Sequence, residues 1–156
     1  MTDRSNGAAR DGLKISPSLL AANFADIRQV IRMVDDAGVD SLHLDVMDGR
    51  FVPNITWGPK IIADLRPLSQ LPFDTHLMIV EPEKYVGDFV KAGSDIVTVH
   101  WVAHGTNSGQ GKGLPGKGKQ GRAQGTSKFR FDNSNRIAEV WVEWNEDALR
   151  KQVAAK

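Results

Sequence analysis

The sequence predicts an α/β protein in which parallel βα units come first and an antiparallel hairpin with a short helix follows. From Leu13 to His100, short β-rich runs alternate with helical patterns, which is typical of parallel βαβ units. Residues 101–131 differ, with six Lys or Arg and no acidic residue, and eight of the fifteen glycines lie between Gly105 and Gly125. At 156 residues, the chain is too short for a complete eightfold βα barrel of ~250 residues.

Four β-rich runs predict the strands of the first part. They are Leu13–Leu20, Val39–Asp45, Pro72–Ile79 and Asp95–His100. Because each run is followed by a helical pattern or by the glycine-rich stretch, we expect the strands to lie parallel in one sheet.

Helical spacing of apolar residues predicts three helices between these strands. Asn23 is expected to cap the first helix, which ends at Gly38. A short second helix is expected around Ile61–Leu65, after a proline-bearing loop. Pro82 suits the first turn of a third helix, which ends at Gly93.

The C-terminal part has the pattern of a β-hairpin. Thr126–Phe131 and Ile137–Trp144 are the expected strands, and the polar run Asp132–Asn135 is the expected turn. A short helix is expected over Glu146–Gln152. The antiparallel arrangement therefore replaces the parallel one in this part of the chain.

Composition excludes several classes of protein and of site. Hydrophobic residues at 40% and charged residues at 25% are typical of a globular domain. The absence of cysteine excludes disulfides and thiolate zinc sites. No apolar run approaches the ~20 residues of a membrane-spanning helix, and residues 1–12 are polar, so we expect no membrane partner and a cytoplasmic location.

Each of the four predicted strands brings side chains of one face to its C-terminal end, where the active sites of α/β folds lie. In strand order they are Ser16 and Ser18; His43, Asp45 and Met47; His76 and Met78; Thr98 and His100. Two imidazoles and a carboxylate there can bind a divalent cation such as zinc, iron, cobalt or manganese. One alternative stays open, since a histidine on an apolar strand is more often a hydrogen-bonded core residue, and residues 45–49 can form a strand end and turn.

Three segments resemble the ribulose-phosphate 3-epimerase family. They are ISPSLLAANF at 15–24, HLDVMDGRFVPN at 43–54 and DTHLMIVEP at 74–82. The resemblance covers about residues 13–100 and implies the first three and a half βα units of a (β/α)₈ TIM barrel. It also implies an isomerase that interconverts D-ribulose 5-phosphate and D-xylulose 5-phosphate, in the pentose phosphate pathway or Calvin cycle, with one bound divalent metal.

The resemblance implies roles for individual residues. They are His43, Asp45 and His76 as metal ligands, Asp45 as an acid/base carboxylate, and Ser18, His76, Met47 and Met78 as contacts of a small phosphosugar substrate. Epimerisation returns the proton to the opposite face, so the family uses a second carboxylate from a later strand, followed by phosphate-binding loops. Neither pattern appears after His100.

The C-terminal part resembles a second family, the SnoaL-like polyketide cyclases. The matching residues are Gly113-Leu114-Pro115, Phe129-Arg130-Phe131 and the run from Arg136 to Trp144. This resemblance implies an α+β cone and a small-molecule-binding or cyclase-type module. An acid/base aspartate of that family corresponds to Asn145, which cannot take up a proton as a carboxylate does.

The two resemblances divide the chain into an N-terminal tail at 1–12, a partial epimerase barrel at 13–100, a Gly/Lys-rich junction at 101–125 and a SnoaL-like hairpin and helix at 126–156. Three functions stay open: an epimerase with an incomplete site, a SnoaL-like binding or cyclase-type module, and a non-catalytic chimeric fragment.

We expect no nucleic-acid partner, because no aromatic residues are interleaved among the lysines. The open edges of a half barrel predict a homo-oligomer, unless the C-terminal part covers one of them. The epimerase resemblance also allows a plastid location.

Overall fold

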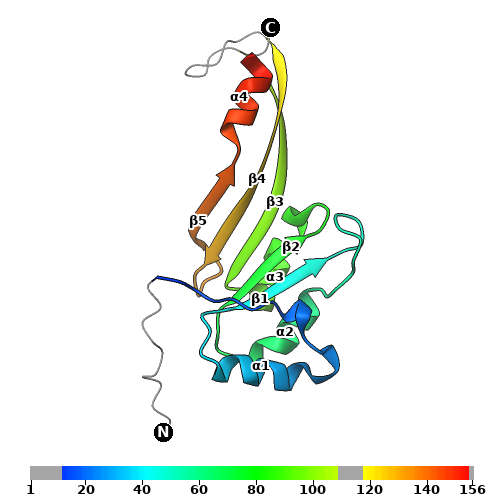
Figure 1. Ribbon diagram of the computed structural model, residues 1–156, viewed down its shortest axis with the longest axis vertical. Helices are drawn as coiled ribbons and strands as arrows, with labels where there is room; N and C mark the ends of the chain where they lie inside the picture. Colours follow the sequence, from blue (N-terminus) through cyan, green and yellow to red (C-terminus); the bar gives the residue numbers. More distant parts are fainter. Residues whose placement is uncertain (1–11, 109–117, 155–156) are drawn as a thin grey trace.

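The structure is a computed structural model that describes residues 12–108 and 118–154. It contains one mixed five-stranded sheet in the order β1-β2-β3-β4-β5 (Figure 1). The strands are β1 (Leu42–Met47), β2 (Phe73–Met78), β3 (Ile96–Asn107), β4 (Lys119–Phe131) and β5 (Ile137–Trp144). Strands β1, β2 and β3 are parallel, and β3, β4 and β5 are antiparallel. The predicted α/β class, with parallel strands first and antiparallel strands after them, is confirmed.

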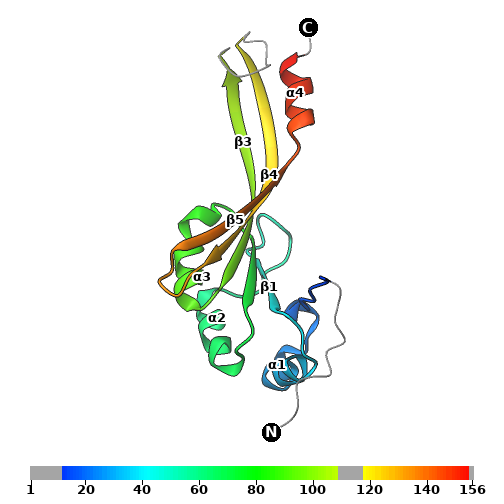
Figure 2. The same cartoon turned by 90° about the vertical axis from the view of Figure 1, so that its left-hand side faces the viewer.

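Helices α1, α2 and α3 lie together on one face of the parallel strands (Figures 1 and 2). Their bounds, with those of the C-terminal helix and the 3-10 turns, are α1 (Ile27–Asp36), α2 (Pro59–Leu65), α3 (Val86–Ala92), α4 (Glu146–Ala154), η1 (Leu19–Ala21), η2 (Phe24–Asp26), η3 (Arg66–Leu68) and η4 (Pro82–Lys84). Asn23 caps η2, through a bond from the Ala25 N–H to its side chain, and α1 begins only at Ile27. The glycines expected to end α1 and α3 have positive φ, +67° at Gly38 and +112° at Gly93.

The core lies between the helices and one face of the parallel strands. Its buried residues alternate along the strands and meet apolar residues of the helices: Leu42, Leu44 and Val46 on β1, Phe73 and Leu77 on β2, Val97 on β3, and Ile31, Ile62, Leu65, Phe89 and Val90 on the helices. Because successive side chains of a strand point to opposite faces, the other face of β1 carries His43, Asp45 and Met47. The fold therefore places the candidate functional residues on the face without helices.

The predicted strand at Leu13–Leu20 is wrong. This segment is extended but makes only an isolated bridge between Ser18 and His43. The His43 N–H donates to the Pro17 carbonyl at 2.9 Å. Proline has no N–H, and no strand of the described chain lies on the other side of the segment, so a regular ladder does not form.

The predicted strand at Asp95–His100 is too short. Strand β3 continues to Asn107 because β4 pairs with it along its whole length, from Ile96 opposite Arg130 to Asn107 opposite Lys119. Strand β4 likewise begins well before the predicted hairpin start at Thr126. The edge of β3 is therefore covered by the C-terminal part, and the β3–β4 pair extends beyond β1 and β2 (Figure 1).

Helix α4 packs against the first half of β4, in the part of the strand that extends beyond β1 and β2 (Figure 2). A Cβ on Gly121 would lie 2.6 Å from Leu149 Cδ1, so the glycine allows the helix to approach the strand. The Gln152 side chain accepts a bond from the Arg122 N–H and donates to the Arg122 carbonyl, both at 3.0 Å. These contacts fix the C-terminal helix on the extended strand pair.

Two predicted segments lie partly outside the described residues: all of the N-terminal tail except residue 12, and residues 109–117 of the Gly/Lys-rich junction. Among the helices that the structure describes, none has the length and apolar character needed to cross a bilayer.

Candidate metal centre

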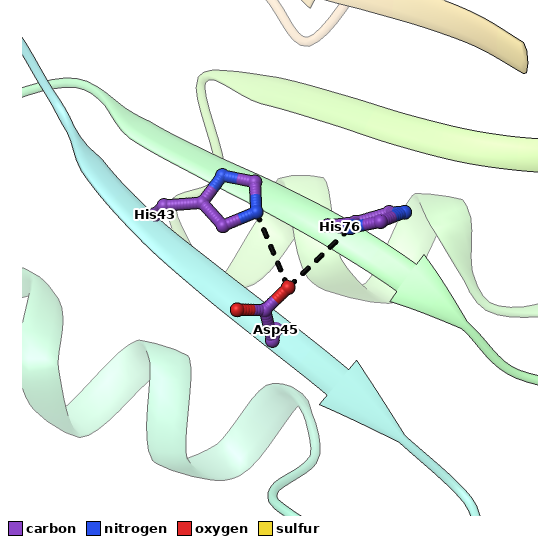
Figure 3. Close-up of side chains that lie close together, drawn as sticks. All are labelled: His43, Asp45 and His76. Carbon is purple, nitrogen blue, oxygen red and sulfur yellow. Dashed lines mark ion pairs between the residues drawn. The ribbon is translucent and has the colours of Figure 1, made fainter. Parts of the chain in front are cut away.

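The side chains of His43, Asp45 and His76 converge on the open face of the parallel strands, which is the face without helices (Figure 3). Asp45 Oδ1 lies 3.2 Å from His43 Nε2 and 3.4 Å from His76 Nδ1. Donor atoms that share a cation at about 2.1 Å are roughly 3.0 to 3.4 Å apart, at the angles of octahedral and tetrahedral coordination. The spacing and the two-nitrogen, one-oxygen donor set therefore fit one divalent cation, with sites left for other ligands.

The strand register produces this convergence. His43 and Asp45 are two residues apart on β1 and share a face. Asp45 is the register partner of His76 on β2, because β1 and β2 run parallel and in step from Leu42 and Phe73. The pairing of β1 with β2 thus joins His43 and Asp45 of one strand and His76 of the other into one site.

Ser18 orients the carboxylate of Asp45. Its Oγ donates to Asp45 Oδ2 at 2.6 Å and also accepts a bond from the Leu20 N–H at 3.2 Å. Since Oδ2 is occupied by the serine, Oδ1 faces the two histidines. The Asp45 side chain is only 13% exposed, so this orientation is protected from water.

Met47 and Met78 lie at the ends of β1 and β2. They are register partners and share the site face with Asp45 and His76. Both are partly buried. The fold therefore brings the two methionines together at the end of the sheet where the predicted substrate contacts are expected.

A second carboxylate, Asp74, lies behind His43 and was not among the predicted site residues. Asp74 Oδ2 is 3.6 Å from His43 Nδ1 and accepts a bond from Lys128 Nζ of β4 at 2.6 Å. Burial alone raises the pKa of Asp74, but His43 and Lys128 hold this pKa below its ordinary value. Asp74 in turn raises the pKa of His43, against the opposing effect of burial.

His76 is held from its other side by His100. The two Nε2 atoms lie 2.7 Å apart, and His100 Nδ1 is 2.9 Å from Thr126 Oγ1 of β4. Phe51 stacks on the His100 ring, with centroids 6.2 Å apart and an interplanar angle of 11°. Burial and the neighbouring imidazoles lower the pKa of His76.

Sequence patterns could identify some of the residues that contact the two histidines from behind. Asp74 is two residues before His76 on one strand, so the alternation that selects His43 and Asp45 also selects it. Thr126 and Lys128 carry no such signal, because their place depends on the long-range register between β3 and β4.

A cleft of about 1140 Å³ lies beside His100, between the ends of the parallel strands and the C-terminal part. The residues that line it include Phe51, Trp101, Arg122, Glu143 and Trp144. The cleft thus brings together residues from both regions that the sequence separates.

Comparison with known proteins relates the first part of the chain to one family. The model of the Ribulose-phosphate 3 epimerase family matches residues 14–113. The chain is 56% identical over 92 residues to the Ribulose-5-phosphate-3-epimerase, chloroplastic, of Arabidopsis thaliana, a match that covers 59% of the chain and 33% of the relative. It is 59% identical over 86 residues to the Ribulose-phosphate 3-epimerase of Synechocystis sp., covering 55% and 37%. With the Bacillus subtilis protein of the same name it shares 52% identity over 88 residues, covering 56% and 41%. These matches span about a third to two fifths of the relatives' length.

Proposed function

The chain belongs to the ribulose-phosphate 3-epimerase family, a family of isomerases, and from this premise we propose that it interconverts D-ribulose 5-phosphate and D-xylulose 5-phosphate by metal-assisted proton transfer. The observation that carries the proposal is the cluster of His43, Asp45 and His76 on the open face of the sheet. We assign the chain to the cytoplasm or to a plastid, since its relatives include bacterial proteins and one named as chloroplastic.

His43, Asp45 and His76 would hold one zinc, iron, cobalt or manganese ion in this proposal. Their donor spacing and their nitrogen and oxygen atoms support it. When bound, such a cation polarises the substrate carbonyl and makes the hydrogen on the adjacent carbon more acidic.

Asp45 is the proposed acid/base group. Its carboxylate would remove the proton from the carbon next to the carbonyl, and Ser18, which donates to Oδ2, would fix the orientation of that carboxylate. Asp74 is unsuited to this role, because it is buried and paired with Lys128. His76, Met47 and Met78 line the same face, and with Ser18 they are the proposed contacts of the phosphosugar.

Epimerisation also requires a second proton carrier on the opposite face of the substrate. The carboxylates of β5 lie four strand spacings from Asp45, roughly 19 Å at about 4.8 Å per spacing, which is too far to reach the same carbon. We propose that the second carrier comes from another copy of the chain. Specific activity should then rise with protein concentration, and a constant specific activity would exclude this assignment.

The test of the proposed activity is a coupled epimerase assay with D-ribulose 5-phosphate, run with and without each of the four metals. We expect metal-dependent turnover that the Asp45→Asn variant reduces by at least 10²-fold. Asp64→Asn is the matched control, because Asp64 is an exposed partner of Lys60 on α2. Equal turnover in wild type and Asp45→Asn would refute the assignment, and no turnover from folded protein would favour the non-catalytic chimeric fragment.

A second candidate is a SnoaL-like small-molecule site in the C-terminal part. The cleft lined by Trp101 and Trp144 favours it, since two indoles offer a stacking surface for an apolar ligand. Asn145 supports binding over cyclase chemistry, because its Oδ1 accepts the Ala148 N–H at 2.8 Å and caps α4. Titration with an aromatic polyketide, followed by tryptophan fluorescence, tests it: saturable quenching supports the site, and an unchanged signal excludes it.

A further inference from the structure

Strand β4 lies beyond the part of the chain that matches the epimerase family, yet it contacts the residues behind both candidate histidine ligands. Its side chains at 126, 128 and 130 share the face of the sheet that carries Asp45 and His76. Two of them, Thr126 and Lys128, reach toward the metal centre.

Thr126 completes a chain of hydrogen bonds with a defined direction. If His76 Nδ1 faces the cation, that nitrogen carries no hydrogen, so the hydrogen resides on Nε2. His76 Nε2–H then donates across 2.7 Å to His100 Nε2, which leaves the His100 hydrogen on Nδ1. This last N–H donates across 2.9 Å to Thr126 Oγ1. The threonine hydroxyl therefore accepts the last hydrogen of this chain and supports the His100 tautomer that receives the His76 N–H.

Lys128 supports the other histidine through Asp74. The Lys128 ammonium donates to Asp74 Oδ2 at 2.6 Å, and the same oxygen lies 3.6 Å from His43 Nδ1. Asp74 is 5% exposed, and its Oδ1 has no hydrogen-bond partner among the described residues, so the lysine compensates a buried charge. With the carboxylate held beside Nδ1, His43 presents Nε2 to Asp45.

We propose that β4 supplies the outer shell of the metal centre, with Thr126 acting through His100 on His76 and Lys128 acting through Asp74 on His43. The inference rests on the metal site of the proposed function. Both residues are positioning residues, because neither touches the cation. Partners of this kind fix the orientation and the tautomer of ligand histidines, and their loss typically lowers metal affinity by about 10- to 100-fold.

The experiment measures Co²⁺ binding by visible absorption and by calorimetry on the full chain. Thr126→Val keeps the shape but removes the acceptor, and we expect it to weaken Co²⁺ binding by about 10-fold or more and to change the absorption bands. Thr126→Ser keeps the hydroxyl and should bind like wild type. Thr106→Val is the matched control on β3, at a position away from the centre.

Lys128 is tested in the same way. We expect Lys128→Met to weaken Co²⁺ binding by about 10-fold or more and Lys128→Arg, which keeps the positive charge, to retain most of it. Circular dichroism verifies that each variant is folded. If a methionine or valine variant unfolds, Lys128→Gln and Thr126→Ala take its place, because each also removes the charge or the hydroxyl whose loss should weaken Co²⁺ binding.

A second readout is the ring hydrogen of His100. In ¹⁵N NMR spectra of the Zn²⁺-loaded protein, we expect a hydrogen-bonded, slowly exchanging Nδ1–H on His100 in wild type and Thr126→Ser, and fast exchange of this hydrogen in Thr126→Val. Wild type that binds no Co²⁺ would overturn the metal site itself. Wild-type affinity and an unchanged His100 Nδ1–H in Thr126→Val would overturn the role of Thr126.

Discussion

Gly125→Ala is predicted to destabilise the chain at the point where β4 is inserted between β3 and β5. Gly125 pairs with Trp101 on one side and Trp144 on the other. A Cβ at this position would lie 2.5 Å from the Glu143 carbonyl oxygen, 2.5 Å from Trp101 Cζ2 and 2.8 Å from Trp144 Cβ. One of these obstacles is backbone and another is a large indole, so a rotamer change of one flexible side chain cannot relieve the overlap.

The expected magnitude follows from the size of this overlap. Carbon atoms in contact are normally about 3.5 to 4.0 Å apart, so the neighbouring strands must move by roughly 1 Å. Forcing an extra methyl into a filled site costs roughly 1 to 3 kcal/mol of unfolding free energy. For a domain of this size, that loss corresponds to a fall in Tm of roughly 2 to 12 °C.

Urea unfolding followed by circular dichroism measures the effect. Gly105→Ala on β3 is the matched control, because nothing lies within 4 Å of its added Cβ. The control should be neutral or slightly stabilising, since alanine restricts the unfolded chain more than glycine does. If Gly125→Ala unfolds at the same urea concentration as Gly105→Ala, the packing of β4 described above is incorrect.

Two further predictions concern the parallel part of the sheet. Phe73 is fully buried on β2 under the Arg66 guanidinium, so Phe73→Ala should cost roughly 3 to 5 kcal/mol in thermal or urea unfolding, and a cost no larger than that of Phe24→Ala, at a half-exposed site, would contradict its place in the core. Asp48 accepts backbone N–H bonds from Val80, Phe51 and Arg50, which lower its pKa below the ordinary value of 3.8, so it stabilises the fold above that pH and loses the effect as the pH falls through its folded pKa. The stability advantage of wild type over Asp48→Asn should therefore shrink on acidification in pH-dependent unfolding, whereas an advantage that is constant down to pH 2 would exclude this role.

Local patterns predict most of the parallel part of the fold. The alternation along β1 and β2 separates the apolar residues of the core from His43, Asp45 and His76, and the structure brings these three together. The start of β1 is displaced from the predicted Val39 to Leu42, because the ladder begins only where Phe73 is available as a partner. Periodicity locates a face of a strand, but the neighbouring strand determines where pairing begins.

In the C-terminal part, local sequence patterns do not predict the first half of β4. Glycine, lysine and alanine are poor strand formers, so residues 119–125 carry no strand signal. They form the first half of β4 because β3 offers a continuous edge with which they pair. The same long-range register brings Thr126 and Lys128 to the site, which explains why both were missed.

The measurement that tests the account most directly is anomalous diffraction from crystals of the chain grown with Co²⁺ or Zn²⁺, recorded at the absorption edge of the metal. We predict one strong anomalous peak within bonding distance of His43 Nε2, Asp45 Oδ1 and a His76 ring nitrogen. The absence of a peak between β1 and β2, or a metal held only by other residues, would contradict the metal centre on which the proposed epimerase function depends.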